Sequence, residues 1–253
     1  MPVRTRLPLR LPQRLLFWSA LPLIAAQGLA LRRRAPRFAG AQGEPSGTAL
    51  PVDRASGAPL RLLAVGDSIV AGVGAGDMRL ALAGATASAL AALSGRAVQW
   101  QACGRIGINA AGLHRRLLPE LQAADVDVVL ISVGVNDVTA LTPRARFARE
   151  LEGLLRGLRQ RHPQAWILLP GLPPLERFPL LPVPLRQLMG LRARLLEDTA
   201  REVAAADPRV LPLALPFRPG PEAFSGDGFH PNAESYAEYG ALLASAAWER
   251  LRR

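Results

Sequence analysis

"VDVVLISVG", residues 126–134, is a continuous run of apolar and β-branched residues that ends in glycine. A strand with one face in water would alternate apolar and polar residues, whereas only Asp127 and Ser132 interrupt this run. Continuous apolar strands are buried on both faces, which is typical of a parallel sheet covered by helices on both sides. The run therefore predicts a central strand of an α/β protein.

The segments around this strand alternate between strand-like and helix-like patterns from residue 60 onward. Strands are predicted over residues 60–66, 97–103, 126–134, 165–171 and 209–215, and helices over residues 80–95, 111–122, 143–161, 185–206 and 233–252. This alternation predicts a three-layer α/β/α sandwich with a five-stranded parallel sheet, doubly wound in the flavodoxin-like manner. Sheets of this kind bind ligands at the carboxyl ends of their strands.

Polar or glycine-rich segments stand at the ends of these predicted elements. "GDS" (66–68) follows the first strand, "GRIG" (104–107) the second and "GVND" (134–137) the third, and "DGFH" (227–230) precedes the last helix. The carboxyl ends of parallel strands meet at one edge of a sheet, so we expect the four segments to converge there. A surface turn would not need this convergence, but a functional site would.

These four segments, in this order, resemble the sequence blocks of the SGNH hydrolase family, also called GDSL esterases and lipases. The resemblance covers roughly residues 60–250, and its four blocks are matched by Gly66-Asp67-Ser68, Gly107, Gly134-Val135-Asn136-Asp137 and Asp227-Gly228-Phe229-His230. Each motif is short enough to recur by chance, so their conjunction carries the resemblance. Gly104 is a rival to Gly107, which we prefer because the "INAAGL" that follows suits the family's loop into a helix.

The matched residues suit acyl transfer through a serine. Ser68 is a weak nucleophile unless a base takes its proton, and His230 is the histidine placed to do so. Asp227, three residues earlier, can hold the other ring nitrogen and stabilise the imidazolium that forms. The resemblance further implies an oxyanion hole made by the backbone N–H groups of Ser68 and Gly107 and the side-chain amide of Asn136. We therefore expect an esterase, lipase or lysophospholipase that cleaves acyl esters through an acyl-enzyme.

Other interpretations remain open. An acyltransferase or deacetylase of the same family would use the same acyl-enzyme, and a flavodoxin-like binding module at a membrane would use none of this chemistry. Ser68 could also be only a helix N-cap. The elbow GxSxG is absent around Ser68, which argues against an α/β-hydrolase proper. Asp67 is expected to brace its loop.

A long apolar and proline-rich segment, residues 171–190, follows the fourth predicted strand. Its side chains could line an acyl channel or touch a bilayer, and the candidate substrate-binding residues are Leu175, Phe178, Leu180 and Leu181. Packing of the same segment over the core is an equally open interpretation.

The amino-acid composition argues against a nucleic-acid partner, a cofactor and a metal site. Of the net charge of +11, residues 1–59 contribute +7, from nine arginines and two acids, so the predicted domain is only mildly basic and we expect no nucleic-acid partner. Cys103 is the only cysteine, and the three histidines lie far apart with no metal-ligand spacing. We therefore expect no cofactor and no metal.

The chain ahead of the predicted domain is divided by composition into two parts. Residues 1–34 contain an uncharged apolar run, residues 15–31, between arginines on both sides; residues 35–59 are rich in small residues and predict a linker to a hydrolase domain at 60–253. The run predicts a membrane anchor or in-plane helix, a signal peptide, or a soluble arm. We expect a membrane-associated or exported protein, and a location on the cytoplasmic side of the membrane is also compatible with the sequence.

Overall fold

The computed structural model describes residues 22–30, 39–53, 55–121, 125–216, 218 and 220–252. The strands are β1 (Ser46–Ala49), β2 (Leu60–Gly66), β3 (Val98–Gly104), β4 (Val128–Ser132), β5 (Trp166–Pro170) and β6 (Val210–Leu213). The helices are α2 (Leu82–Ser94), α3 (Ala110–Gly112), α4 (Val135–Thr139), α5 (Arg144–Arg161), α6 (Leu185–Ala204) and α7 (Ala233–Leu251).

The strands form one sheet in the order β1-β3-β2-β4-β5-β6. The five strands from β3 to β6 pair in parallel and have the predicted flavodoxin-like order. The sheet is mixed, however, because β1 pairs antiparallel to β3 at the edge. The expectation of a five-stranded parallel sheet is corrected accordingly to six strands.

The added strand β1 lies inside residues 35–59, the stretch whose composition predicts a linker. Its sequence, Ser-Gly-Thr-Ala, has no apolar alternation, and most of the strand is exposed, so hydrophobic patterning does not reveal it. Backbone pairing with β3 holds it in the sheet, and of its side chains only Ala49 packs against the core. Residues 46–49 therefore belong to the folded domain.

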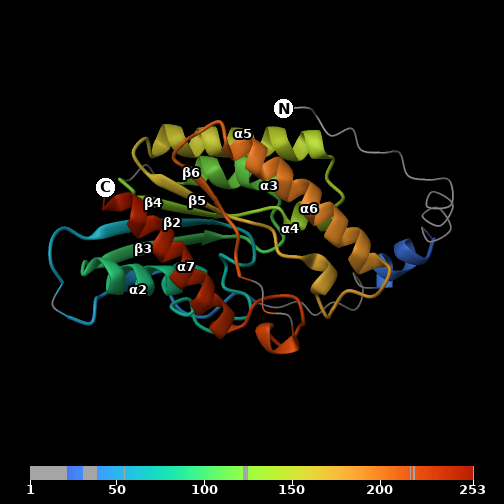
Figure 1. Cartoon of the computed structure of the whole chain (residues 1–253), viewed down its shortest axis with the longest axis horizontal. Helices are drawn as coiled ribbons and strands as arrows, with labels where there is room; N and C mark the ends of the chain where they lie inside the picture. The colour runs from blue at the N-terminus through green and yellow to red at the C-terminus, as the bar shows by residue number, and fades with distance from the viewer. Residues whose placement is uncertain are drawn as a thin grey trace.

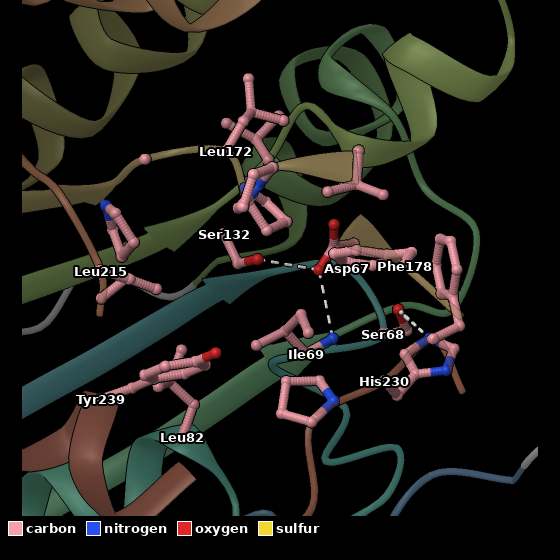
Figure 2. Close-up of a pocket in the computed structure, with 18 of the residues that line it drawn as sticks. Asp67, Ser68, Ile69, Leu82, Ser132, Leu172, Phe178, Leu215, His230 and Tyr239 are labelled. Carbon is pink, nitrogen blue, oxygen red and sulfur yellow. Dashed lines mark hydrogen bonds between the residues drawn. The ribbon is translucent and has the colours of Figure 1, made fainter. Parts of the chain in front are cut away.

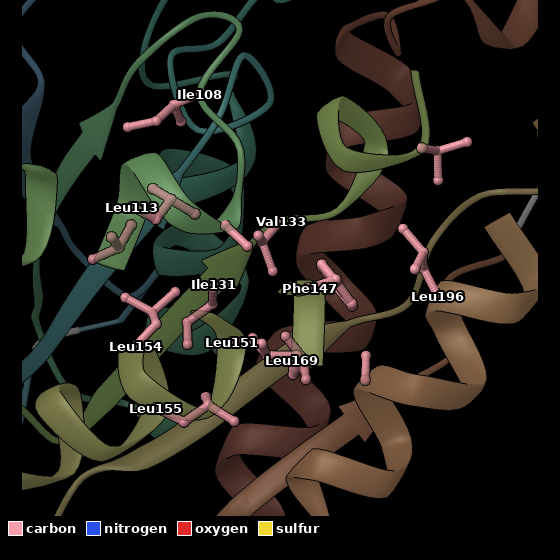
Figure 3. Close-up of a cluster of buried hydrophobic side chains, with 14 of the residues drawn as sticks. Ile108, Leu113, Ile131, Val133, Phe147, Leu151, Leu154, Leu155, Leu169 and Leu196 are labelled. Atoms are coloured by element: carbon pink, nitrogen blue, oxygen red, sulfur yellow. The ribbon is translucent and has the colours of Figure 1, made fainter. Parts of the chain in front are cut away.

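Helices cover both faces of the sheet (Figure 1). In β2, Leu62 and Ala64 pack with α2 and α7 on one face, whereas Leu63 and Val65 pack with the layer of α3, α5 and α6 on the other. Successive side chains of a strand point to opposite faces of the sheet. Both faces of the strand must therefore be apolar if a helical layer is to pack on each. Figure 3 shows the α5 side of the core, where Phe147 and Leu151 pack beside Ile131 of β4.

The segment predicted as one helix over residues 111–122 is divided in the structure. α3 ends at Gly112, a π-helical turn follows over Leu113–Leu117, and a 3₁₀ turn over Leu118–Glu120. Pro119 has no N–H to donate, which disrupts the regular hydrogen-bond ladder at this point. Two further 3₁₀ turns lie at Leu175–Arg177 and Pro221–Ala223.

Residues 22–30, part of the apolar run at 15–31, form a short helix. No helix among the described residues has the length and hydropathy that crossing a bilayer requires. The remainder of segment 1–34 lies outside the described residues.

Candidate active site

Ser68 lies at the carboxyl end of β2, the strand at which the direction of chain winding reverses across the sheet. Its Oγ is 3.0 Å from Nε2 of His230 (Figure 2). A Cβ atom on Gly66 would lie 2.5 Å from the Ser132 carbonyl oxygen, so only glycine allows the neighbouring strand to approach this closely. The end of β2 is thereby held against β4, with Ser68 at the start of the following turn.

The turn that carries His230 also carries its carboxylate partner. Nδ1 of His230 is 2.6 Å from Oδ2 of Asp227. The Asp227 carboxylate also accepts bonds from the Ser225 hydroxyl and from the backbone N–H groups of Phe229 and His230, each at 2.8 Å. Burial favours the protonated form of Asp227, but the bonds from His230, Phe229 and Ser225 outweigh burial and lower the pKa of this carboxyl. The turn therefore holds an ionised carboxylate beside the imidazole.

Helix α7 joins this turn to the loop after β2. Asn232 caps α7 by accepting a bond from the Ser235 N–H at 2.9 Å. The hydroxyl of the buried Tyr236 donates to the Val73 carbonyl at 2.8 Å. The two segments approach so closely that a Cβ on Gly74 would lie 2.3 Å from the Pro231 carbonyl oxygen. These contacts fix the distance between Ser68 and His230.

Asp67 is buried directly behind the serine. Its Oδ1 accepts bonds from the Ile69 N–H at 3.1 Å and from the Ser132 hydroxyl at 2.9 Å, which brace the loop (Figure 2). Burial raises the pKa of Asp67 to about 6, against the opposing effect of these bonds and of the nearby His230.

Two of the three predicted oxyanion-hole residues, Asn136 and Gly107, lie close together. The Asn136 amide donates to the Ile108 carbonyl at 2.8 Å, which places Asn136 against the turn that contains Gly107. Gly107 has φ +77°, a conformation that favours glycine. Within the described part of the chain, no hydrogen bond joins the N–H groups of Ser68 and Gly107 to a protein acceptor.

Gly104, the rival in the glycine block, has a different structural role. It ends β3, and a Cβ at this position would lie 2.3 Å from the backbone nitrogen of Ala71 and 2.6 Å from the carbonyl carbon of Val70. Gly104 therefore allows the loop after β2 to pack on β3.

A cavity of about 220 Å³ opens beside Ser68 and His230 and extends along the carboxyl edge of the sheet. Its lining is mostly apolar and includes Ile69, Leu82, Val133, Leu172, Phe178, Leu215, Phe224 and Phe229. Phe178 stacks edge-on against Phe224 and Phe229, with ring centroids 5.0 and 5.2 Å apart. An apolar part of a ligand next to Ser68 would therefore contact mostly apolar side chains.

The four candidate substrate-binding residues of the loop occupy different environments. Phe178 lines the cavity, whereas Leu175 and Leu181 are buried in the core and Leu180 is half buried beside Gly228; these three do not line the cavity. Much of the loop thus packs over the core, as the alternative interpretation expects.

Sequence reasoning did not identify two residues that support the site. Ser132 has a signal in its position, because it is the last residue of β4 and β4 lies next to β2. Tyr236 has none, because an aromatic residue in a helix is ordinarily a core residue. Only the folded structure shows its bond to the loop that carries Ser68.

Comparison of the sequence with known proteins identifies a matching family and a related protein. Residues 64–238 match the GDSL-like lipase/acylhydrolase family. The chain is 30% identical over 199 residues to a GDSL-like esterase of Mycobacterium tuberculosis, an alignment that covers 76% of this chain and 63% of that protein. The chain thus matches less than two thirds of that relative's length.

Two solved structures share the fold. A family two carbohydrate esterase from Clostridium thermocellum in complex with cellohexaose aligns with a TM-score of 0.62 and 18% identity, covering 78% of this chain and 67% of that one. The psychrotrophic esterase EstA from Pseudoalteromonas sp. aligns with a TM-score of 0.58 and 16% identity, covering 76% of this chain and 99% of that one. At these identities the alignments establish a common fold.

Proposed function

Because the chain belongs to the GDSL-like lipase/acylhydrolase family, we propose that it is a serine hydrolase that cleaves acyl esters through an acyl-enzyme on Ser68. The observation that carries this proposal is the connected series of side chains from Ser68 through His230 to Asp227, with adjacent atoms 3.0 and 2.6 Å apart. A serine, a base and an orienting carboxylate at these distances are what nucleophilic catalysis requires.

In the proposed first half-reaction, Nε2 of His230 takes the proton of the Ser68 hydroxyl as Oγ attacks the ester carbonyl carbon. This transfer requires the neutral tautomer with hydrogen on Nδ1, which the bond to Asp227 favours. The imidazolium then gives its proton to the leaving alcohol oxygen as the carbon–oxygen bond of the ester breaks. The acyl group remains on Ser68.

In the second half-reaction a water replaces the alcohol. His230 takes a proton from the water, whose oxygen attacks the acyl carbonyl carbon, and the proton returns to Oγ as the acyl bond to Ser68 breaks. The products are the free acid and the restored enzyme. In both steps the carbonyl oxygen gains negative charge. We propose that the N–H groups of Ser68 and Gly107 and the second amide hydrogen of Asn136 stabilise this charge by donating hydrogen bonds to the oxygen.

The lining of the cavity supports an apolar acyl group as part of the substrate. Side chains such as Leu172, Phe178 and Leu215 offer an acyl chain burial from water, worth about 0.8 kcal/mol for each methylene. From β2 to β6 the sheet edge crosses three strand spacings, or about 14 Å at roughly 4.8 Å each. This length favours esters of medium-length acyl chains, of the lipid type, over acetyl esters.

A series of p-nitrophenyl esters, from acetate through butyrate and octanoate to palmitate, tests this function. We expect the full chain to hydrolyse them, with kcat/KM rising from acetate to octanoate, and Ser68→Ala to be inactive. Ser46→Ala, on the exposed edge strand β1, is the matched control and should keep wild-type activity. Folded protein that hydrolyses no ester of the series would refute the proposal.

A second substitution separates the choice of acyl chain from the chemistry. Leu215→Trp adds bulk within the cavity and should lower kcat/KM for octanoate while leaving acetate nearly unchanged. Leu93→Trp, on the exposed surface of α2, is its control. If Leu215→Trp affected both esters equally, the proposal of ester hydrolysis would stand, but the cavity would not be the binding site of the acyl chain.

A further inference from the structure

The short helix of residues 22–30, here called the docked helix, is fastened to the loop after β5. Nε2 of Gln27 donates to the Val183 carbonyl at 2.6 Å, and Oε1 of Gln27 accepts from the Leu185 N–H at 3.2 Å. Ile24, one turn earlier on the same face, is buried in the core cluster that contains Leu181 and Leu185. Figure 1 shows this helix in blue beside the start of α6.

The outward face of the docked helix is apolar throughout. Its exposed residues are Pro22, Leu23, Ala25, Ala26, Leu29 and Ala30, and Leu23 and Leu29 are exposed by 54% and 52%. The single polar side chain, Gln27, is turned inward. A helix on a protein surface ordinarily has the opposite arrangement, with its apolar side inward and polar residues in water. The outward face therefore suits an apolar phase.

The loop beneath the docked helix also reaches the cavity. Val183, whose carbonyl accepts the Gln27 bond, is 52% exposed. Farther back along the loop, the Leu180 N–H donates to the Gly228 carbonyl at 3.3 Å, two residues before His230. Phe178 lines the cavity itself. The docked helix and the loop thus present exposed apolar residues close in the chain to the candidate active site.

The sequence on both sides of the docked helix is basic. Residues 1–38 contain eight arginines and no acidic residue. Basic residues beside an apolar helix face favour the surface of an anionic bilayer. A second copy of the chain would bring the same positive charge to the contact, so charge disfavours self-association through this face.

We propose that the outward face of the docked helix, with the adjoining exposed residues Pro182 and Val183, is a binding surface for an anionic lipid bilayer. Ile24 and Gln27 hold the inner face of residues 22–30 against the domain, so this part of the helix has only its outward face free and lies along the bilayer surface. Lipid binding is independent of the proposed hydrolase activity. Together with that activity, it places the cavity at a surface where lipid esters are found.

Cosedimentation with vesicles tests the surface without catalysis. The full chain with Ser68→Ala is mixed with vesicles of phosphatidylcholine alone or with phosphatidylglycerol, so that no lipid is consumed. We expect binding to the phosphatidylglycerol vesicles that survives a wash at about 1 M salt, where screening is strong. Leu23→Glu with Leu29→Glu should weaken the partition by about tenfold or more, because both leucines would lose their burial in lipid.

The matched control places the same two charges elsewhere. Leu50→Glu with Leu93→Glu changes two leucines that are exposed by 71% and 49%, far from the docked helix in the chain, and should bind as the parent does. The single variant Leu29→Glu should lose part of the binding, and circular dichroism melts establish that each variant is folded. Equal loss in both double variants, complete release by salt, or no binding at all would overturn the proposal. A dimer that dissociates in Leu23→Glu with Leu29→Glu would identify a second copy as the occupant instead.

Discussion

At the scale of single residues, the site depends on groups that are held in place before any substrate arrives. Asp227 accepts four hydrogen bonds, and one of them orients His230 toward Ser68. Asn136 uses one amide hydrogen on the Ile108 carbonyl, which leaves its second amide hydrogen for the proposed oxyanion contact. Preorganised donors of this kind lower the barrier without a reorganisation cost during reaction.

Asn136→Ala tests the side-chain donor of the proposed oxyanion hole. Removal of one such donor typically lowers kcat by about 10²–10³. KM should change little, because the bond strengthens mainly in the transition state. Steady-state kinetics on a p-nitrophenyl ester measures both constants. Full activity in the folded variant would exclude Asn136 from this role.

Two glycines distinguish backbone chemistry from backbone packing. At Gly107 an added methyl meets no atom within 4 Å, and φ +77° costs alanine about 1–2 kcal/mol, so Gly107→Ala should fold and lose turnover. At Gly104 the methyl would clash with the backbone of Ala71, so Gly104→Ala should lower Tm strongly or fail to fold. Thermal melts and kinetics on both variants check this. A folded, inactive Gly104→Ala beside a nearly normal Gly107→Ala would reverse the assignment.

Asp67 makes stability depend on pH in an unusual direction. Because burial raises the pKa of Asp67 from 3.8 to about 6, the folded protein holds this proton more tightly than the unfolded chain. The contribution of Asp67 to the free energy of unfolding therefore falls as pH rises from about 4 to about 6. Asp67→Asn keeps an oxygen acceptor for Ile69 and Ser132 but carries no charge.

We expect the stability of Asp67→Asn relative to the parent to grow across this pH window, by up to about 3 kcal/mol for a shift of roughly two pKa units. Urea unfolding of both proteins at several pH values measures the difference. A difference that is constant between about pH 4 and pH 7 would mean that Asp67 titrates in the folded protein as it does in the unfolded chain.

At the scale of elements, sequence patterns predict what is buried and miss what is held mainly by backbone pairing. The predicted strand at residues 60–66 coincides with β2, because a strand buried on both faces must be apolar throughout and Gly66 ends it. β1 could not be predicted in this way, because its exposed side chains carry no pattern. The site motifs were predictable as convergent loops, but Tyr236 and the cavity depend on contacts between distant segments.

We expect residues 39–59, which include β1, to stabilise the folded domain. Ahead of β1, the Ala41 N–H donates to the Ala71 carbonyl, and Gln42 exchanges backbone bonds with Gly76 and Met78, all within the loop after β2. A chain that begins at residue 60 loses these contacts and the pairing with β3, whereas one that begins at residue 39 keeps them. We expect the shorter chain to have a lower Tm and lower kcat/KM. Equal values for the two would show that residues 39–59 act only as a linker.

At the scale of the whole molecule, the flavodoxin-like order explains how four short motifs become one site. Chain winding reverses at β2, so the loops after β2 and its neighbours open a crevice at the carboxyl edge of the sheet. Helix α7 follows His230 and returns over the α2 face, where the buried Tyr236 joins it to the loop that carries Ser68. The apolar cavity extends from this point toward β6.

Covalent labelling of Ser68 shows whether a neighbouring base activates this serine. A fluorophosphonate reacts only with a serine that a neighbouring base activates, so it reports the proposed pair of Ser68 and His230 whatever the natural ester is. We predict that the full chain gains one label, that peptide mapping places it on Ser68, and that Ser68→Ala and His230→Ala abolish it. Folded protein that takes no label, or that takes it on another serine, would mean that Ser68 is not the nucleophile.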